Sequence, residues 1–213
     1  MNKIYIPLNR SFYLDDTIEV AKNLLGKILV KKSGKMLLTG KIVETEAYMG
    51  DHDPACHAYR KITKRSRTLY KTGGTIYVYF VYGNYYCFNI VTEEEGKGCA
   101  VLIRALEPID GIEYMKENRE KVKNIYELTN GPSKLCLAFD IESEMNDKDI
   151  TGSSFFISNP LMENKFEIAV SKRIGLNIGE EFMYRFFIKN NPFVTKHKFN
   201  KEIIYIKITG KHK

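Results

Sequence analysis

The chain of 213 residues has the length of one large domain, residues 1–213, and 44% of its residues are hydrophobic, which is enough for a sizeable core. No run of 18 apolar residues predicts a transmembrane helix, and residues 1–10 lack the apolar segment of a signal peptide. We therefore expect a soluble protein that does not bind membranes and stays where it is made. The net charge of +7 is compatible with nucleic-acid binding but is not diagnostic of it.

The first predicted elements are a helix and two strands. Residues 15–25 begin with two acidic residues, carry apolar residues at helical spacing and are followed by Gly26, which predicts a helix. Residues 27–32 and 36–48 predict two strands that are joined by a turn at Ser33-Gly34.

Two glutamates, Glu44 and Glu46, lie in the second of these strands. Because side chains alternate along a strand, both carboxylates point to the same face. Carboxylates on a sheet usually face water, and that interpretation stays open here. The strand is mostly apolar, however, which favours at least one glutamate close to buried surface. A carboxylate that has lost part of its solvent can act as a general base on water.

Charge is distributed unevenly in the segment that follows. Residues 44–53 hold four acidic residues and no basic one, whereas residues 60–71 hold six basic residues and no acidic one. A charge run is usually a solvated loop. A basic loop between a carboxylate-bearing strand and an aromatic hairpin also fits a surface that contacts phosphates. The candidate phosphate-binding residues are Arg60, Lys61, Lys64, Arg65, Arg67 and Lys71.

Residues 75–89 predict a β-hairpin that is rich in aromatic residues. Five of the fourteen tyrosines fall within ten residues, and only Gly83-Asn84 interrupts the β-forming pattern. Alternation places Tyr77 and Tyr79 on one face of the first strand. Tyr82 lies beside the turn, where a large ring is hard to bury. It is either an exposed tyrosine on an ordinary sheet or a wedge that inserts between stacked bases.

Two polar residues in the next apolar segments have two interpretations each. Arg104 interrupts a predicted strand at residues 99–105, and it either reaches solvent or pairs with a carboxylate inside a site. Asn89 ends the second strand of the hairpin. It is either a turn residue or a residue that recognises a ligand through hydrogen bonds. Further along, Asp110 and Glu113 predict a capping box for a helix that runs to about residue 119.

The C-terminal half continues the same mixture of elements. Gly131-Pro132-Ser133 predicts a helix that continues through Phe139. Further strands are predicted at residues 153–158, 165–170, 183–188 and 202–208. Together these elements predict a single α+β domain, with a mostly antiparallel mixed sheet, a protruding β-hairpin and a few flanking helices.

The sequence favours neither disulfides nor a metal site. The four cysteines show no CxxC spacing, and Cys87 and Cys99 lie in apolar strands, which predicts buried thiols in a reducing compartment. His52 and His57 lie near Asp51 and Asp53 and could ligate a metal. Their spacing matches no zinc or magnesium pattern, and we expect no metal site.

Several motifs follow one another along nearly the whole chain. They are IVETEAYMG at 42–50, His57, the basic loop ending near Lys71, GTIYVYFVYGNYYCFNI at 74–90, CAVLIRALEP at 99–108, LTNGPSKLC at 128–136, RIGL at 173–176 and NPFVT at 191–195. Their order and spacing resemble the alkyladenine (3-methyladenine) DNA glycosylases, whose fold is like the C-terminal domain of formyltransferases.

This resemblance implies catalytic roles for three residues. Glu46 would be the general base that activates the attacking water. Arg104 and the backbone carbonyl of Ile174 would help to hold that water. We expect Glu44 to have a supporting structural part, although its role is open.

The resemblance also implies how a damaged base would be held. Tyr48, His57 and Tyr79 would form a stacking pocket for the flipped base. Asn89 would exclude the exocyclic amine of guanine, and Tyr82 would enter the duplex and fill the gap left by the extruded nucleotide.

The resemblance therefore implies a monofunctional DNA glycosylase of base excision repair. The enzyme would flip alkylated or deaminated purines out of double-stranded DNA, hydrolyse the N-glycosidic bond and leave an abasic site. The motifs contain no evident lysine nucleophile, and no metal or organic cofactor is implied. We expect a monomer in the cytoplasm of a prokaryotic-type cell, associated with the nucleoid.

Two other functions are compatible with the residues. A metal-dependent nuclease could use Glu44, Glu46, Asp51 and Asp53, and it would lose activity in EDTA and cut the strand without alkali. A non-catalytic nucleic-acid-binding module would keep every measurable property after the substitution Glu46→Gln.

Overall fold

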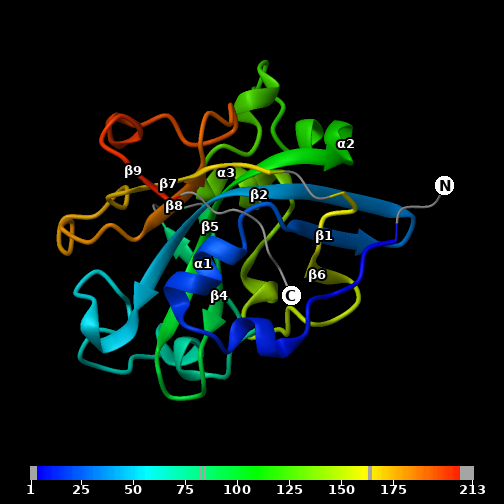
Figure 1. Cartoon of the computed structure of the whole chain (residues 1–213). Coiled ribbons are helices and arrows are strands. Elements are labelled where there is room, and N and C mark those ends of the chain that lie inside the picture. The colour runs from blue at the N-terminus through cyan, green and yellow to red at the C-terminus, as the bar shows by residue number, and fades with distance from the viewer. Residues whose placement is uncertain (1–3, 82, 84, 163–164, 207–213) are drawn as a thin grey trace.

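The computed structural model describes residues 4–81, 83, 85–162 and 165–206 (Figure 1). Its helices are short and its centre is one antiparallel sheet. The α-helices are α1 (Thr17–Asn23), α2 (Ile112–Glu117) and α3 (Pro132–Ala138). The 3-10 turns are η1 (Arg10–Tyr13), η2 (Gly50–His52), η3 (Arg67–Tyr70), η4 (Ile125–Glu127), η5 (Ser143–Met145) and η6 (Lys198–Asn200).

Within these described ranges nine strands form the sheet, and every pairing between them is antiparallel. The strands are β1 (Ile28–Ser33), β2 (Met36–Met49), β3 (Ile76–Val81), β4 (Tyr85–Thr92), β5 (Cys99–Asp110), β6 (Phe155–Ser158), β7 (Ile168–Ser171), β8 (Arg185–Ile188) and β9 (Ile204–Ile206). The main order is β3-β4-β5-β2-β8-β7-β9, and β1 pairs with both β2 and β6. The predicted α+β class with a mostly antiparallel sheet is confirmed.

The long strand β2 organises the sheet, across which it runs in Figure 1. It pairs with β5 along one edge and with β1 and then β8 along the other. The register with β5 shifts around Glu44, where an irregularity interrupts the ladder. Residues 42–47 are all buried, so β2 has covered surface on both faces in this stretch. A strand that is buried on both sides can hold polar groups away from solvent.

Local sequence signals explain the helices that the structure contains. Asp16 caps α1, because its carboxylate accepts hydrogen bonds from the backbone N–H groups of Ile18 (2.9 Å) and Glu19 (3.2 Å). Helix α3 begins with Pro132 at its first turn, as predicted. All three predicted helices exist, although α1 is shorter at each end than residues 15–25.

The predicted capping box before α2 is wrong. Asp110 is the last residue of β5, and its carboxylate accepts a hydrogen bond from the Thr39 hydroxyl (2.7 Å) on the neighbouring strand. The residue that precedes α2 is Gly111, with φ of +77° and no side chain to cap the helix. A Cβ atom at Gly111 would lie 2.3 Å from Leu38 Cδ2, so the glycine also allows close packing against β2.

The main core lies between the sheet and the helices α1 and α3, and a smaller cluster lies beside it. Thr45 Oγ1 on β2 donates to the carbonyl of Ala21 in α1 (2.8 Å), which fixes that helix on the sheet. The smaller cluster contains Cys56, Ala58, Leu69, Tyr77, Val91 and Ala100. All four cysteines are buried and free, which confirms the predicted buried thiols. Among the described residues, no helix has both the length and the apolar composition of a membrane span.

The two helix starts give a direct test of capping. Replacing Asp16 by alanine should lower the free energy of unfolding by about 1 kcal/mol, because two backbone N–H groups lose their acceptor. Replacing Glu113 by alanine should cost no more than about 0.5 kcal/mol, since Glu113 pairs with Lys116 on the surface (2.8 Å). Urea denaturation of both variants measures the difference, and equal losses would contradict the assignment.

Candidate active site

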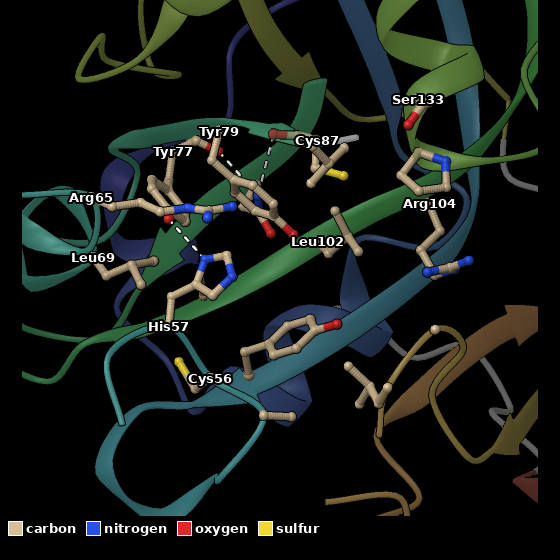
Figure 2. Close-up of a pocket in the computed structure, with 18 of the residues that line it drawn as sticks. Cys56, His57, Arg65, Leu69, Tyr77, Tyr79, Cys87, Leu102, Arg104 and Ser133 are labelled. Carbon is tan, nitrogen blue, oxygen red and sulfur yellow. Dashed lines mark hydrogen bonds between the residues drawn. The ribbon is translucent and has the colours of Figure 1, made fainter. Parts of the chain in front are cut away.

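A pocket of about 480 Å³ opens beside the smaller cluster (Figure 2). Its walls come from β2, the loop after β2, η3, the hairpin β3–β4, β5, the start of α3 and the loop after β7. The lining residues include Tyr48, His57, Arg65, Tyr77, Tyr79, Asn89, Arg104 and Ile174. The sequence-predicted catalytic and base-binding residues therefore converge on one cavity, apart from Tyr82, which lies outside the described residues, and Glu46, which lies directly behind the wall.

One wall of the pocket is aromatic. Tyr77 and Tyr79 point to the same side of β3, as predicted, and His57 approaches both from the loop after β2 (Figure 2). His57 Nδ1 lies 2.9 Å from the Tyr77 hydroxyl, and its ring meets the Tyr79 ring at 71° with a centroid distance of 4.6 Å. His57 is exposed by its solvent-accessible surface, yet desolvation of its ring and the nearby Arg65 cation lower the pKa of His57 to about 4. The imidazole is therefore neutral at physiological pH.

The tyrosines of the pocket keep their hydroxyl protons at neutral pH. Burial raises the pKa of Tyr77 to about 12. Burial also raises the pKa of Tyr79 and, together with the negative charge of Glu46, the pKa of Tyr48. The Tyr48 hydroxyl donates its proton to Glu46 Oε2 at 3.0 Å. These rings can therefore act as stacking surfaces and as hydrogen-bond donors, but not as anions.

Glu46 is fully buried and is held by three hydrogen bonds. Its Oε1 accepts the backbone N–H of Ile174 at 2.7 Å, and its Oε2 accepts Tyr48 Oη and Arg104 Nη1 at 3.0 and 3.3 Å. All three donors line the pocket, so the carboxylate lies behind the wall that they form. The interpretation that placed both glutamates in solvent is wrong, because β2 is covered on both faces.

Glu44 holds the other side of Arg104. Its Oε1 accepts Arg104 Nε at 3.1 Å and Arg185 Nε at 2.7 Å, and its Oε2 accepts the backbone N–H of Thr195 at 2.8 Å. Desolvation favours the protonated carboxyl, but the two cations and the Thr195 hydrogen bond outweigh it and lower the pKa of Glu44. Desolvation likewise opposes the charge of Arg104, yet Glu46 and Glu44 raise its pKa above the ordinary value. Arg104 thus pairs with carboxylates, and the interpretation that it reaches solvent is wrong.

Sequence reasoning missed two buried arginines. Arg185 pairs with Glu44, and Arg173 forms a two-pronged ion pair with Asp53, in which Arg173 Nη2 lies 2.7 Å from Asp53 Oδ1. Arg173 also donates to the carbonyl of Ala47 at 2.9 Å, so it joins the loop after β7 to β2 and to the loop after β2. Arg185 interrupts an apolar strand just as Arg104 does, and that signal could have found it.

Asp53, one of the candidate metal ligands, is bound by protein groups instead. Asp53 accepts hydrogen bonds from the backbone N–H groups of Met49 (3.2 Å) and Ala55 (3.0 Å) in addition to its ion pair with Arg173. Within the part of the chain that the structure describes, no group of three or more His, Cys, Asp or Glu residues is placed to hold a metal ion.

Asn89 lies inside a strand and not at its end. Strand β4 continues to Thr92, and only 3% of Asn89 is exposed. Its Nδ2 donates to the carbonyls of Tyr77 (3.1 Å) and Cys87 (3.4 Å), which fixes the amide in the pocket wall. The interpretation of Asn89 as a turn residue is therefore wrong.

The basic loop does not act as one uniform surface. Arg60, Lys61, Lys64 and Arg67 are exposed, whereas Lys71 pairs with Asp147 at 3.0 Å. Arg65 lines the pocket, with its guanidinium carbon 4.9 Å from the centroid of the Tyr79 ring. Contacts of these six residues with phosphate remain a prediction.

Comparison with known proteins identifies the family. The model of the methylpurine-DNA glycosylase (MPG) family matches residues 11–192. The chain belongs to this family. Curated relatives carrying the name "Putative 3-methyladenine DNA glycosylase" include proteins of Clostridium botulinum (strain Alaska E43 / Type E3), 46% identical over 200 residues, and Legionella pneumophila (strain Corby), 45% identical over 192 residues. In both cases the alignment covers 89% of this chain and 98% of the relative.

A relative from Clostridium perfringens (strain 13 / Type A) has the same name and is 46% identical over 203 residues, again across 98% of its length. The resemblance found in the sequence motifs is thus confirmed. As a member of the methylpurine-DNA glycosylase family, the protein is an enzyme that hydrolyses N-glycosyl bonds.

Removing one partner of a buried ion pair should strongly destabilise this glycosylase. Replacing Glu44 by glutamine should cost about 3–5 kcal/mol or prevent folding, because two buried guanidinium groups lose a charged partner. Replacing Glu19, whose pair with Lys22 lies on the surface, should cost less than about 1 kcal/mol. Urea denaturation at pH 7 compares the two variants. A loss below about 1 kcal/mol for Glu44→Gln would contradict the proposed pairing.

The low pKa of His57 predicts how stability depends on pH. The unfolded chain takes up a proton near the ordinary value of 6.5, whereas the folded chain resists protonation until about pH 4, so His57 lowers stability as pH falls between these values. Wild-type protein should lose more stability between pH 7 and pH 5 than the variant His57→Gln. The exposed His52 offers the control, since His52→Gln should keep the wild-type dependence. Identical curves for wild type and His57→Gln would refute this assignment.

Proposed function

We propose that this glycosylase takes an alkylated or deaminated purine, flipped out of duplex DNA, into the aromatic pocket and hydrolyses its N-glycosidic bond with a water activated by Glu46. The observation that carries the proposal is the arrangement of Glu46 behind the pocket wall. A buried carboxylate bound by Tyr48, Arg104 and Ile174 lies next to a cavity whose opposite wall is made of aromatic rings.

The need for flipping follows from access. A purine that is stacked in duplex DNA presents neither its faces nor its glycosidic bond to a side chain, so the base must leave the stack at a cost of a few kcal/mol. A cavity of about 480 Å³ is within the size range of small-molecule sites. Tyr48, Tyr79 and His57 would stack on the extruded base, and damaged bases that pair poorly would be extruded more easily.

Hydrolysis needs a water held near C1′ of the sugar. Glu46 would accept the proton of this water as it attacks, while Arg104 and the backbone carbonyl of Ile174 hold the water in place. The sugar develops oxocarbenium character as the base departs, and the nearby negative charge would stabilise it. The electron pair of the broken bond leaves with the base. A purine alkylated at N3 or N7 is cationic and departs as a neutral base, whereas hypoxanthine or ethenoadenine would need a proton on the leaving base.

Asn89 would limit which bases enter the pocket. Its amide nitrogen already donates to backbone carbonyls of β3 and β4, and these two hydrogen bonds fix the orientation of the side chain. A rigid amide at this place would exclude the exocyclic amine of guanine, which supports a preference for damaged purines over normal guanine.

The hairpin and the basic loop would contact the DNA around the lesion. Next to the turn, Phe80 and Tyr85 are 50% and 43% exposed, which supports a hairpin tip that enters the duplex with Tyr82 as its wedge. The exposed cations Arg60, Lys61, Lys64 and Arg67 would bind phosphates beside it. We further propose that the enzyme is monofunctional, works as a monomer without metal or organic cofactor, and acts on DNA of the nucleoid in the cytoplasm.

Single-turnover base release tests the role of Glu46. A duplex with one ethenoadenine or hypoxanthine, and separately methylated DNA, is incubated with enzyme in EDTA. Wild type should release the base, and the strand should break only after alkali. Glu46→Gln should slow release by at least about 100-fold, because the general base is lost. The matched control Glu113→Gln, at an exposed position of helix α2, should keep the wild-type rate.

The other outcomes identify the competing functions. Strand breakage before alkali that is seen without EDTA and lost in EDTA would indicate a metal-dependent nuclease. No base release from any of the three substrates would indicate a protein that only binds DNA. A wild-type rate in Glu46→Gln would remove Glu46 from the mechanism. Thermal melting and DNA binding of this variant verify that it is folded.

A further inference from the structure

Arg65 occupies a position that its place in the basic loop did not predict. Its side chain points into the pocket toward Tyr77 and Tyr79 (Figure 2). The guanidinium carbon lies 4.9 Å from the centroid of the Tyr79 ring, and Nη2 donates to the carbonyl of Phe80 at 3.3 Å. The guanidinium is therefore placed over one face of Tyr79, which is one of the rings proposed to stack on the substrate.

Arg65 also differs from Arg104, the other arginine in the pocket wall, in how its charge is balanced. Arg104 is paired with Glu44 and Glu46, and the second cation at Glu44 is Arg185, so two carboxylates balance two guanidinium groups. Among the residues that the structure describes, no carboxylate forms an ion pair with Arg65. Its positive charge is thus the unbalanced charge of the pocket, since His57 is neutral at physiological pH.

We propose that Arg65 is a specificity-determining residue, whose unpaired cation at the Tyr79 face disfavours cationic purines relative to neutral purines. The inference rests on the proposed function, because it concerns the base that this pocket receives. Aromatic rings attract a cationic base through their negative faces. Arg65 already occupies one such face and adds repulsion between like charges in the pocket.

A neutral base meets different conditions in the same pocket. The flat guanidinium can stack on a neutral purine and donate hydrogen bonds to its ring nitrogens or its oxygen. Hypoxanthine and ethenoadenine offer such acceptors and carry no charge. The N-glycosidic bond of a cationic alkylated base breaks more easily than that of a neutral base. Arg65 would therefore reduce the difference in release rate between the two kinds of base and keep the enzyme active on neutral lesions.

The test compares one cationic and one neutral lesion. Single-turnover release of 3-methyladenine from methylated DNA and of hypoxanthine from a defined duplex is measured for wild type, Arg65→Gln and Arg67→Gln. Glutamine keeps much of the length of arginine and removes its charge. Arg67 is the matched control, because it is an exposed arginine of the same loop that does not line the pocket. Both residues are exposed enough to be replaced without disturbing the core.

Arg65→Gln should raise the ratio of the 3-methyladenine rate to the hypoxanthine rate by about tenfold. Arg67→Gln should change this ratio by less than about twofold. An unchanged ratio in Arg65→Gln, with both rates lowered in parallel and restored at low salt, would overturn the proposal in favour of a phosphate contact. If wild type releases neither 3-methyladenine nor hypoxanthine, the proposed function is overturned, and this inference with it.

Discussion

The arrangement around the pocket depends on the burial of one carboxylate between two guanidinium groups. Glu44 on β2 binds Arg104 on β5 and Arg185 on β8, so a single ionic cluster connects three adjacent strands. Taking such charges out of water costs several kcal/mol for each ion unless they remain together. None of the three side chains can leave without exposing the others to that cost. Arg104 is consequently fixed with Nη1 toward Glu46, and the charged groups of the site need little reorganisation before a reaction.

Part of this arrangement is visible in the sequence because it follows from local rules. The alternation of Glu44 and Glu46 placed both on one face of a strand, and the short loop between two tyrosine-rich segments fixed the pairing of β3 with β4. A local pattern could mark Arg185 as an unusual residue, but its ion pair with Glu44 spans 141 residues of sequence, so no local pattern could reveal the partner. The failed capping box shows the opposite effect. The spacing of Asp110 and Glu113 fits a capping box, but in the structure the Asp110 carboxylate accepts a hydrogen bond from the Thr39 hydroxyl on the neighbouring strand instead.

The basic loop shows a second reason why sequence reasoning stops short. Six cations in twelve residues indicate a charged surface, but they do not tell which way each side chain points. Lys71 is neutralised by Asp147, and Arg65 finds a tyrosine ring and a carbonyl within reach inside the pocket. The residues of one basic run therefore lie in at least two environments, the protein surface and the pocket. The direction of each side chain is decided by packing partners that come from β3 and from the region after α3.

The burial of the thiols has a consequence for a protein that meets alkylated DNA. Agents that alkylate purines also alkylate sulfur, and the thiolate is the form of cysteine that reacts. Cys56 and Cys87 line the pocket, and burial raises the pKa of Cys56 to about 11 and also raises the pKa of Cys87. Hardly any thiolate exists there at neutral pH. Burial thus lowers the fraction of the alkylation-sensitive thiolate form at the walls of the binding site itself.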